Sequence, residues 1–322
     1  MATVATVEAL IQAGGPHVAG LMEELETRLA VLAGSHGPEL ARHGGTTIAA
    51  GGKRLRPLLV FLSAGEAPDA RPGSLRAAAA VELVHSATLV HDDVLDRGTL
   101  RRGRPTVVAA AGRQMATAAG DFLFSRAFVE LAEGGRPDAV AVLADACLGL
   151  SEGELMQRAD AWDPTVSVER YERRCELKTA RLFEAACRLG ALEGAGPERE
   201  LGEFGRRIGL AFQLLDDVLD VSGPAERTGK PRGADLLDGT VTLPLILARE
   251  REPGLATIDL RAVGEAEVAA LCDRIAATGA LDAARSRALG IVAEAKAGLP
   301  DLPARQRAAL ELVADGVVER FA

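Results

Sequence analysis

Aromatic residues are scarce in this sequence of 322 residues, where Phe, Trp and Tyr together make up 3%. Aliphatic side chains must therefore fill most of the core, and the hydrophobic fraction of 48% is typical of a globular protein. Cysteine is also rare, and the four cysteines show neither a CxxC pair nor a Cys/His spacing that would hold zinc. We expect these cysteines to be buried and reduced, which fits a reducing compartment.

The sequence also lacks the features that direct a chain to nucleic acid or into a membrane. Its net charge is −9 and its pI about 5.3, whereas nucleic acids and anionic membranes are bound by basic surfaces. No uninterrupted apolar run reaches the roughly 18–20 residues of a membrane span. The N-terminus lacks the basic and then apolar segments of a signal peptide. We therefore expect a cytoplasmic protein with no transmembrane segment and no nucleic-acid partner.

Helical periodicity runs through nearly the whole chain. Residues 21–34 repeat leucine on one stripe with charged residues opposite, which is typical of an amphipathic helix. Residues 74–95 are apolar nearly all round, which indicates a buried central helix. The connecting segments are too short for a flexible linker, so we predict one all-α domain over residues 1–322. Similar patterns predict further helices at about 112–133, 137–159, 168–190, 198–221, 240–250, 265–278, 281–297 and 303–320.

An acidic motif occurs twice, as HDDVLD at 91–96 and as LDDVLD at 215–220, each time after an apolar helical run. Carboxylates four residues apart share one face of a helix and repel one another, and burial without partners costs more still. A hard cation offsets both costs. Mg²⁺ fits, because it takes carboxylate oxygens, keeps several waters and completes its shell with substrate phosphates.

Two basic segments interrupt the acidic sequence, GGKRLRP at 51–57 and LRRGRPT at 100–106. Arginine binds phosphate oxygens in a bidentate fork, and lysine adds a point charge. A single surface Lys or Arg is usually only solvated. Two glycine-bracketed basic segments on either side of a metal motif instead indicate a small anionic ligand such as a diphosphate.

The motifs stand in an order that resembles the trans-type polyprenyl diphosphate synthases, over roughly residues 45–250. The order is GGKRLRP, VELVHSATLVHDDVLD, LRRGRPT, LKTARLFEAAC, FQLLDDVLD, TGKPRGADL and TLPLI. The resemblance implies a large helical bundle or barrel around a deep central cavity, of the isoprenoid synthase type, usually as a homodimer. It also implies a prenyltransferase that condenses isopentenyl diphosphate with an allylic diphosphate (dimethylallyl, geranyl, farnesyl or geranylgeranyl).

The resemblance assigns roles to individual residues. About three Mg²⁺ ions on the allylic diphosphate would be held by the two acidic motifs, namely Asp92, Asp93, Asp96, Asp216, Asp217 and Asp220. The same diphosphate would be bound by Arg101, Lys178 and Lys230. Isopentenyl diphosphate would be bound without metal by Lys53, Arg56, His85 and Arg102. Thr179 and Gln213 would lie near the developing allylic cation, and the released diphosphate would take up the proton.

The sequence departs from the family pattern at two positions. Thr240 and Ala234 stand where a phosphate-binding lysine is frequent, so Lys230 would carry more of the allylic diphosphate. The length of the product is expected to depend on Ala87 and Thr88, which lie about one helical turn before Asp92. In the family, bulky aromatic residues there stop growth at fifteen carbons. Since both residues are small, we expect a product of twenty carbons or more, of medium or long chain.

Other classes of protein remain open. A class I terpene cyclase shares the helical fold and one acidic motif, but it has no need for an isopentenyl diphosphate site. Head-to-head synthases of the squalene type are disfavoured by the same basic segments. A non-catalytic regulatory subunit of a prenyl synthase is the third alternative, although such subunits tend to lose aspartates and none is lost here.

Overall fold

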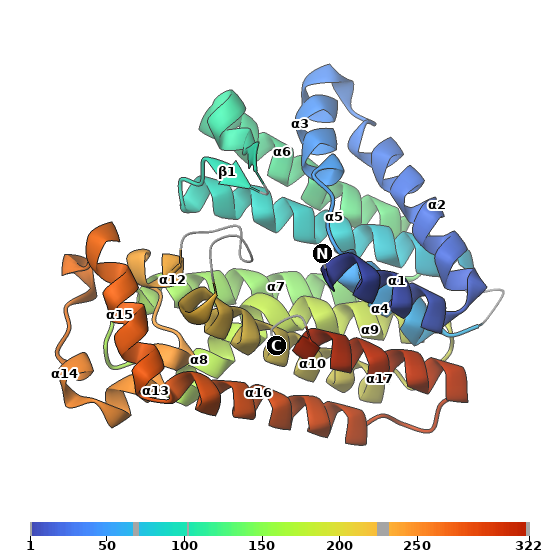
Figure 1. Ribbon diagram of the computed structural model, residues 1–322. Coiled ribbons are helices and arrows are strands. Elements are labelled where there is room, and N and C mark those ends of the chain that lie inside the picture. The colour runs from blue at the N-terminus through green and yellow to red at the C-terminus, as the bar shows by residue number, and fades with distance from the viewer. Residues whose placement is uncertain (1, 67–70, 102, 224–231, 320–322) are drawn as a thin grey trace. The chain divides into compact units, whose positions relative to one another are not determined.

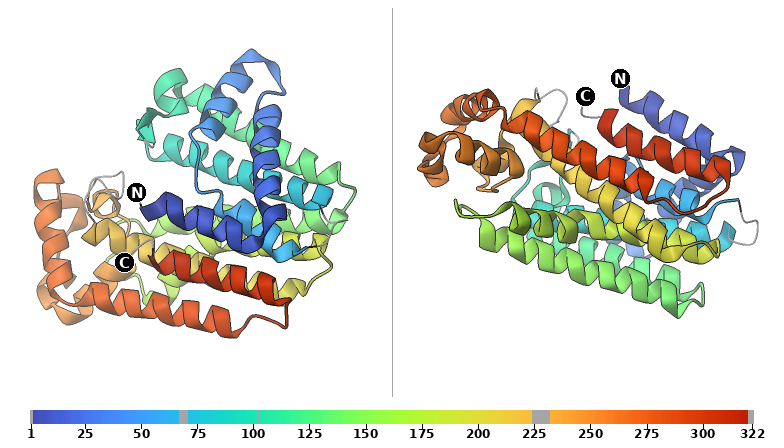
Figure 2. Two further views of the ribbon diagram at one scale, coloured as in Figure 1. Left: turned by 45° about the vertical axis from the view of Figure 1, so that its right-hand side comes forward. Right: turned by 90° about the horizontal axis from the view of Figure 1, so that it is seen from below.

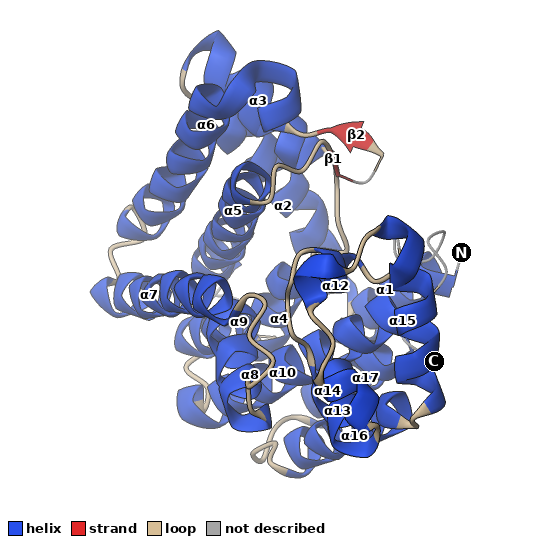
Figure 3. Cartoon of the chain, turned by 90° about the vertical axis from the view of Figure 1, so that its left-hand side faces the viewer, coloured by secondary structure: helices blue, strands red, loops and turns tan. Residues whose placement is uncertain are grey.

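The computed structural model describes residues 2–66, 71–101, 103–223 and 232–319, and within these ranges almost every element is a helix (Figure 3). The strands of the described part are two residues long: β1 (Leu100–Arg101) pairs antiparallel with β2 (Arg104–Pro105). Gly103, with φ 73°, turns the chain between them. The prediction of an all-α protein is confirmed.

The helices and their bounds, in chain order, are α1 (Ala2–Gly14), α2 (Pro16–Ala33), α3 (Gly37–Ala49), α4 (Leu55–Ala64), α5 (Arg71–Leu95), α6 (Val107–Ala132), α7 (Pro137–Asp160), α8 (Val168–Cys175), the π-helix η2 (Glu176–Ala180), α9 (Arg181–Glu193), α10 (Glu198–Ser222), α12 (Ala234–Leu237), α13 (Leu243–Arg251), α14 (Pro253–Ala256), the 3₁₀ helix η3 (Leu260–Ala262), α15 (Glu265–Ala277), α16 (Ala280–Ala297) and α17 (Ala304–Glu319). No described helix is long and apolar enough to cross a membrane.

The chain divides into two compact units. The first comprises Met1–Cys147, Leu182–Gly205 and Leu299–Val313, and the second comprises Leu148–Arg181, Arg206–Gly298 and Ala314–Ala322. Each unit carries one of the acidic motifs, at the end of α5 in the first and near the end of α10 in the second. The two units are therefore described in turn.

In the first unit, α5 and α6 lie side by side and antiparallel (Figure 1), since His91 pairs with Asp121 while Arg76 pairs with Glu130. The run of alanines at 77–80 is fully buried. Alanine is the best helix former, and its small side chain lets a neighbouring helix approach closely. The buried central helix predicted from the sequence is thus confirmed as α5.

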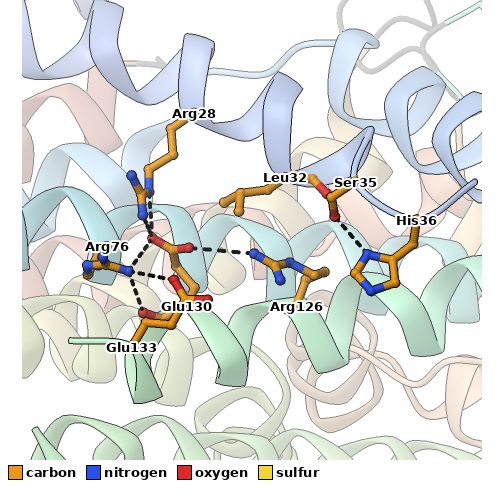
Figure 4. A network of polar contacts seen from close by, with 8 residues as sticks. All are labelled: Arg28, Leu32, Ser35, His36, Arg76, Arg126, Glu130 and Glu133. Carbon is orange, nitrogen blue, oxygen red and sulfur yellow. Dashed lines mark hydrogen bonds and ion pairs between the residues drawn. The ribbon is translucent and has the colours of Figure 1, made fainter. Parts of the chain in front are cut away.

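A buried carboxylate joins three helices of this unit (Figure 4). Glu130 on α6 is fully buried, and its Oε1 accepts a 2.5 Å hydrogen bond from Nε of Arg28 on α2. Arg76 on α5 lies 3.5 Å from the same oxygen, and Arg126 lies 3.9 Å from Oε2. Removing one partner of a buried ion pair typically costs about 3–5 kcal/mol. The cluster therefore fixes α2, α5 and α6 to one another.

In the second unit, α16 runs beside the C-terminal part of α10 (Figure 2, right). Ion pairs link these helices to each other and to α8. Arg287 donates to both carboxylate oxygens of Glu172, with Nη2 at 2.7 Å from Oε2, and Arg207 lies 3.5 Å from Glu294. These pairs are partly exposed, so each contributes at most about 1 kcal/mol. These ion pairs help to orient the helices, but they contribute little to the free energy of unfolding.

Two predicted helices differ from the structure. The helix predicted at 168–190 is interrupted by the π-helix η2, and α8 and α9 lie on either side of it. The helix predicted at 112–133 begins earlier, at Val107, and breaks at Gly112, whose φ is 81°. The predicted leucine stripe of α2 is confirmed, because Leu21, Leu25, Leu29 and Leu32 are at most 5% exposed. All four cysteines are free and buried, as expected.

Candidate active site

The first acidic motif ends α5, and its middle aspartate already has a partner. Arg101 on β1 holds the carboxylate of Asp93 in a bidentate pair, with Nη2 at 2.8 Å and Nε at 3.1 Å from Oδ1. Asp93 is buried, whereas Asp92 is half-buried and Asp96 is exposed. Helical spacing puts Asp92 and Asp96 on one face, with Asp93 about 100° round the helix from Asp92. The motif thus separates one aspartate that orients Arg101 from two that share the more exposed face.

The turn after α5 makes the pairing of Asp93 with Arg101 possible. Arg97 has φ 55°, and the backbone N–H of Gly98 donates to the carbonyl of Asp93 at 2.9 Å. A Cβ at position 98 would lie 3.0 Å from Oδ1 of Asp93. A side chain at Gly98 would therefore crowd the carboxylate that receives Arg101.

His91 fixes the end of α5 against α6. Its Nε2 lies 3.2 Å from Oδ1 of Asp121, and its ring fills the space beside Gly120. A Cβ on Gly120 would lie 2.3 Å from Nε2 of that ring. His91, directly before Asp92, thus occupies a space that exists because Gly120 has no side chain.

The basic loop GGKRLRP is anchored by an arginine that sequence reasoning missed. Arg54 is 7% exposed and donates to Glu82 and Glu26, each at 2.6 Å, and to the carbonyl of Ile48 at 2.9 Å. Its φ of 47° is left-handed, which costs an ordinary residue about 1–3 kcal/mol. These contacts with three helices hold the strained loop in place.

Two predicted substrate residues from this loop lie beside the anchor. Lys53 is half-buried, and the Arg56 guanidinium lies 4.6 Å from the centre of the Phe183 ring. Burial lowers the pKa of Arg56 to about 10, although nearby Glu82 opposes the shift. The Nε of Arg56 has no hydrogen-bond partner among the described residues. Arg56 is therefore a desolvated cation, and desolvation strengthens its interaction with an anion.

A pocket in the same unit brings together some predicted residues and not others. His85 and Arg101 line it, together with Arg54, Arg104 and Asp93. Neither Lys53 nor Arg56 belongs to its lining. Arg102, also predicted for isopentenyl diphosphate, and Lys230, predicted for the allylic diphosphate, lie outside the described residues. Arg104 is a cation of this pocket that the sequence analysis did not single out.

The second acidic motif lies on α10, and its middle aspartate is again engaged. The Tyr171 hydroxyl donates to Oδ2 of Asp217 at 2.6 Å, and Nε2 of Gln213 donates to Oδ1 at 2.7 Å. The Thr179 hydroxyl in turn donates to Oε1 of Gln213 at 2.7 Å. Three predicted site residues, Thr179, Gln213 and Asp217, are thereby linked in one chain of hydrogen bonds.

Burial governs the ionisation of Asp217, which is only 4% exposed. Burial and the negative charge of nearby Asp235 raise its pKa well above the usual range, while the hydrogen bonds from Tyr171 and Gln213 oppose the shift. Burial also raises the pKa of the Tyr171 hydroxyl, which stays a donor. Tyr171 is a buried partner of Asp217 that sequence reasoning missed, and the only signal was its place six residues before the LKTA segment.

The LKTA segment forms the π-helix η2, a distortion that often marks functional sites. The Nζ of Lys178 donates to Oε2 of Glu154 on α7 at 2.5 Å. A Cβ on Gly153 would lie 2.6 Å from the backbone N of Lys178, so only glycine lets α7 approach this closely. Burial would raise the pKa of Glu154, but Lys178 and Arg158 outweigh burial and lower it. Lys178 thus has a carboxylate partner within its own unit.

The segment after α10 adds a carboxylate to the second motif. The backbone N–H of Gly233 donates to the carbonyl of Asp220 at 2.9 Å, and the N–H of Asp235 lies 3.3 Å from Oδ2 of Asp220. Asp235 is close enough to Asp217 to raise its pKa. Asp235 is part of the GADL motif, but the sequence does not show that this residue lies near Asp217. Asp216, Asp217, Asp220 and Asp235 therefore belong to one acidic region.

The donor set has the chemistry that Mg²⁺ requires. Each motif supplies hard carboxylate oxygens on adjacent helical turns, which are the donors that Mg²⁺ prefers. Among the described residues, no three acidic, His or Cys side chains already converge as a complete cage.

Comparison with known proteins assigns the family. The family model described as polyprenyl synthetase matches residues 38–271. The heptaprenyl diphosphate synthase component 2 of Geobacillus stearothermophilus is 41% identical over 281 residues, which cover 84% of this chain and 85% of that protein. The octaprenyl diphosphate synthase of Escherichia coli K12 is 37% identical over 270 residues, which cover 80% of this chain and 84% of that protein.

A solved structure agrees with these relatives. The crystal structure of a polyprenyl synthase from Caulobacter crescentus, complexed with calcium and isoprenyl diphosphate, has a TM-score of 0.89 and 37% identity to this chain. The match covers 98% of both chains. The fold, both acidic motifs and the relatives agree, and the chain therefore belongs to the polyprenyl synthetase family of prenyltransferases.

Proposed function

We propose that this prenyltransferase condenses isopentenyl diphosphate with an allylic diphosphate and releases an all-trans polyprenyl diphosphate of medium or long chain. The observation that carries the proposal is that both acidic motifs are intact and that the middle aspartate of each is held by a partner, Arg101 or Tyr171. Relatives named as heptaprenyl and octaprenyl diphosphate synthases support the product length. Such a product exceeds the lower limit of twenty carbons expected from the sequence.

Enzymes of this family act with a divalent metal. For this chain we propose Mg²⁺, about three ions per site, which when bound neutralises the charge of the departing diphosphate. The proposed ligands are Asp92 and Asp96 in the first unit, and Asp216, Asp220 and Asp235 in the second. We propose that Asp93 and Asp217 position their neighbours, because their buried carboxylates accept hydrogen bonds from Arg101 and from Tyr171 and Gln213.

Within each unit, the side chains would orient a substrate and exclude water from it. In the first unit Arg101, fixed by Asp93, would present its remaining N–H groups to the allylic diphosphate. In the second unit Lys178 and Lys230 are proposed for the same diphosphate. Lys178 would then exchange its contact with Glu154 for phosphate oxygens. Lys53, Arg56, His85 and Arg102 are proposed for isopentenyl diphosphate. Thr179 and Gln213, which are joined by a hydrogen bond, are proposed to direct two oxygen dipoles at the developing allylic cation and to stabilise it electrostatically.

Ala87 and Thr88, the two residues expected to control product length, differ in their burial. Ala87 is completely buried, whereas Thr88 is half-buried and its hydroxyl donates to the carbonyl of His85 at 2.8 Å. With its hydroxyl satisfied by its own helix, Thr88 presents a methyl group to its surroundings. We propose that Thr88 is the position at which added bulk would stop a growing chain.

The test is an assay of the purified chain with MgCl₂, labelled isopentenyl diphosphate and each allylic primer, followed by sizing of the products. Products longer than farnesyl diphosphate support the proposal, and an end point at fifteen carbons contradicts it. A terpene cyclase would leave isopentenyl diphosphate unconsumed. The G. stearothermophilus relative is named as a component, so a regulatory subunit is a specific alternative. Turnover by this chain alone excludes that alternative.

We also propose that residues 1–322 form a single catalytic domain, and that the enzyme is a cytoplasmic homodimer. The family match from 38 to 271 includes parts of both units, which supports a single domain. Leu148 and Leu155 lie two turns apart on α7 and are 72% and 71% exposed, as expected of an interface in an oligomer. Sedimentation of the wild type and of Leu148→Glu tests the dimer, because a charge there should shift the protein toward monomer.

A further inference from the structure

The only tryptophan in the sequence, Trp162, has a strained backbone. It follows α7 in the second unit, and its φ of 67° is left-handed. A bulky residue in this region costs about 1–3 kcal/mol and persists only where its surroundings hold it there. The contacts of Trp162 should therefore show which part of the structure holds its backbone in this conformation.

Trp162 clamps the turn between α12 and α13. Its backbone N–H donates to the carbonyl of Gly239 at 2.8 Å, and its indole ring lies against the same glycine. A Cβ on Gly239 would lie 2.3 Å from the ring atoms Cδ2 and Cε2. Gly239 itself has φ 73°. The guanidinium of Arg261 covers the ring at 5.9 Å from its centre. Two features therefore require glycine at position 239: its positive φ and the indole ring that lies where a Cβ would be.

The clamped turn is continuous with the second acidic motif. The N–H of Thr240, next to Gly239, donates to the carbonyl of Asp235 at 2.8 Å. The N–H of Asp235 lies 3.3 Å from the carboxylate of Asp220, and the N–H of Gly233 binds the carbonyl of that residue. A displacement of the turn would therefore move Asp235 relative to Asp217 and Asp220.

A second support holds the chain just beyond the turn. Arg174 on α8 is 3% exposed, and its Nη2 donates to the carbonyl of Val241 at 2.5 Å. Its Nη1 donates to Asp160, at the end of α7, at 3.2 Å. Thr240 lies between this support and the Trp162 clamp. The turn at 238–242 reads DGTVT and so contains no lysine or arginine of its own.

We propose that Trp162 is a positioning residue of this prenyltransferase. By clamping the turn at Gly239 it fixes Asp235 beside the second acidic motif, and it thereby sets the concentration of divalent cation at which that motif fills. The inference rests on the proposed role of Asp216, Asp220 and Asp235 as metal ligands. It adds a residue outside the motifs that acts only through them.

Three variants of Trp162 separate this role from simple stability. Trp162→Gly removes the ring and also the strain, since glycine adopts a positive φ at no steric cost. Trp162→Ala removes the ring but keeps the strain, and Trp162→Phe keeps an aromatic ring. We expect both Gly and Ala to raise the half-saturating Mg²⁺ concentration by about tenfold, as loss of a supporting contact does at metal sites. The kcat at saturating Mg²⁺ should change little, and Phe should restore most of the Mg²⁺ affinity.

A second readout does not depend on turnover. The unfolding midpoint is measured with inorganic pyrophosphate at rising Mg²⁺ concentrations, because a ligand of the folded state raises the midpoint as its site fills. The curve for Trp162→Gly should shift to higher Mg²⁺ even if its midpoint without Mg²⁺ equals that of the wild type. Leu289→Ala, an exposed change on α16 of the same unit, should leave the curve in place.

The two possible failures are distinguishable. If Asp220→Asn and Asp235→Asn raise the Mg²⁺ requirement but Trp162→Gly and Trp162→Ala do not, the clamp has no positioning role and the proposed metal site stands. If the two aspartate variants leave the requirement unchanged, the metal site is wrong and the inference about Trp162 falls with it. A rise in the requirement for Trp162→Gly that Trp162→Phe reverses supports the positioning role.

Discussion

The hydroxyl of Tyr171 donates a 2.6 Å hydrogen bond to the carboxylate of Asp217, across from α8 to α10. Tyr171→Phe removes this donor and leaves Gln213 as the remaining donor that holds the buried carboxylate. We expect activity at limiting Mg²⁺ to fall by about 10–100-fold, as for other supporting contacts at metal sites. Ser63→Ala, which removes another buried hydroxyl in the other unit, is the control and should retain full activity. Equal losses in both variants would contradict the assignment.

The pKa of Asp217 leads to a prediction with opposite signs for stability and activity. Burial raises this pKa, so between the unfolded and folded values the folded protein binds more protons than the unfolded chain. Stability contributed by this group is present at low pH and is lost as pH rises through that window. Asp217→Asn cannot ionise and should be more stable than the wild type at neutral pH, by about 1 kcal/mol, yet much less active.

Urea unfolding at several pH values measures this effect. The advantage of Asp217→Asn should grow as pH rises above the range in which aspartate ordinarily ionises, and it should vanish in acid. A variant that is less stable than the wild type at neutral pH would show that the ionised carboxylate is stabilised by its neighbours.

The packing of His91 on α5 against Gly120 on α6 predicts that a second substitution restores the stability lost by the first. Gly120→Ala places a methyl group 2.3 Å from Nε2 of the ring, so the ring must move from its place beside Asp121. We expect a loss of about 1–3 kcal/mol in stability, as for other overpacked sites, and lower activity because Asp92 is the next residue. Adding His91→Ala removes the clash and should restore the stability. If the double variant is as unstable as the sum of both changes, the clash is not the cause.

Thr88 and Ala87 should respond differently to a bulky residue. Thr88→Phe adds volume at a half-buried position, so the enzyme should fold and its products should shorten toward farnesyl diphosphate. Ala87→Phe adds the same volume at a fully buried position and should destabilise the fold by at least about 1–3 kcal/mol. Product sizing and thermal unfolding measure the two effects. Unchanged products in Thr88→Phe would rule out this position as the control of chain length.

Thr240→Lys restores a charge that the family pattern leads one to expect. Thr240 is half-buried next to the clamped Gly239, and its backbone N–H already binds Asp235. An added ammonium near a bound diphosphate should lower the KM of the allylic substrate several-fold, with kcat little changed. Thr240→Gln, of similar length and without charge, is the matched control. Equal effects of Lys and Gln would mean that charge is not the reason.

Sequence reasoning reached the helices and the motifs but not the pairings between them. The spacing of Asp92, Asp93 and Asp96 gave their faces on α5, because a helix fixes the angle between successive residues. The bond between Asp93 and Arg101 depends instead on a turn at Arg97 and a strand pair only two residues long, too short to show alternation. Trp162 was equally invisible, since its strain comes from a turn more than seventy residues further along the chain.

Roles carried over from the family differ in how much support the structure gives them. Thr179 on η2 is linked by a hydrogen bond to Gln213 on α10, which in turn binds Asp217 of the same helix. Lys178 is instead paired with Glu154, and Lys53 and Arg56 lie outside the pocket that contains His85 and Arg101. Long cationic side chains have many rotamers, so their positions depend on a ligand more than the positions of helical carboxylates do.

The π-helix η2 has a consequence for the side chains that lie before it in the chain. A π-turn contains one residue more than an α-helical turn of equal rise, so it behaves as an insertion that the chain has retained. Substitutions that turned Glu176–Ala180 into regular α-helix without changing the number of residues would rotate everything before it by about 100° relative to α9. Tyr171 would then leave the side of the helix that reaches Asp217. Homologous sequences with Tyr at this position and the same number of residues before the Lys–Thr pair should therefore keep the π-turn, even where the residues themselves differ.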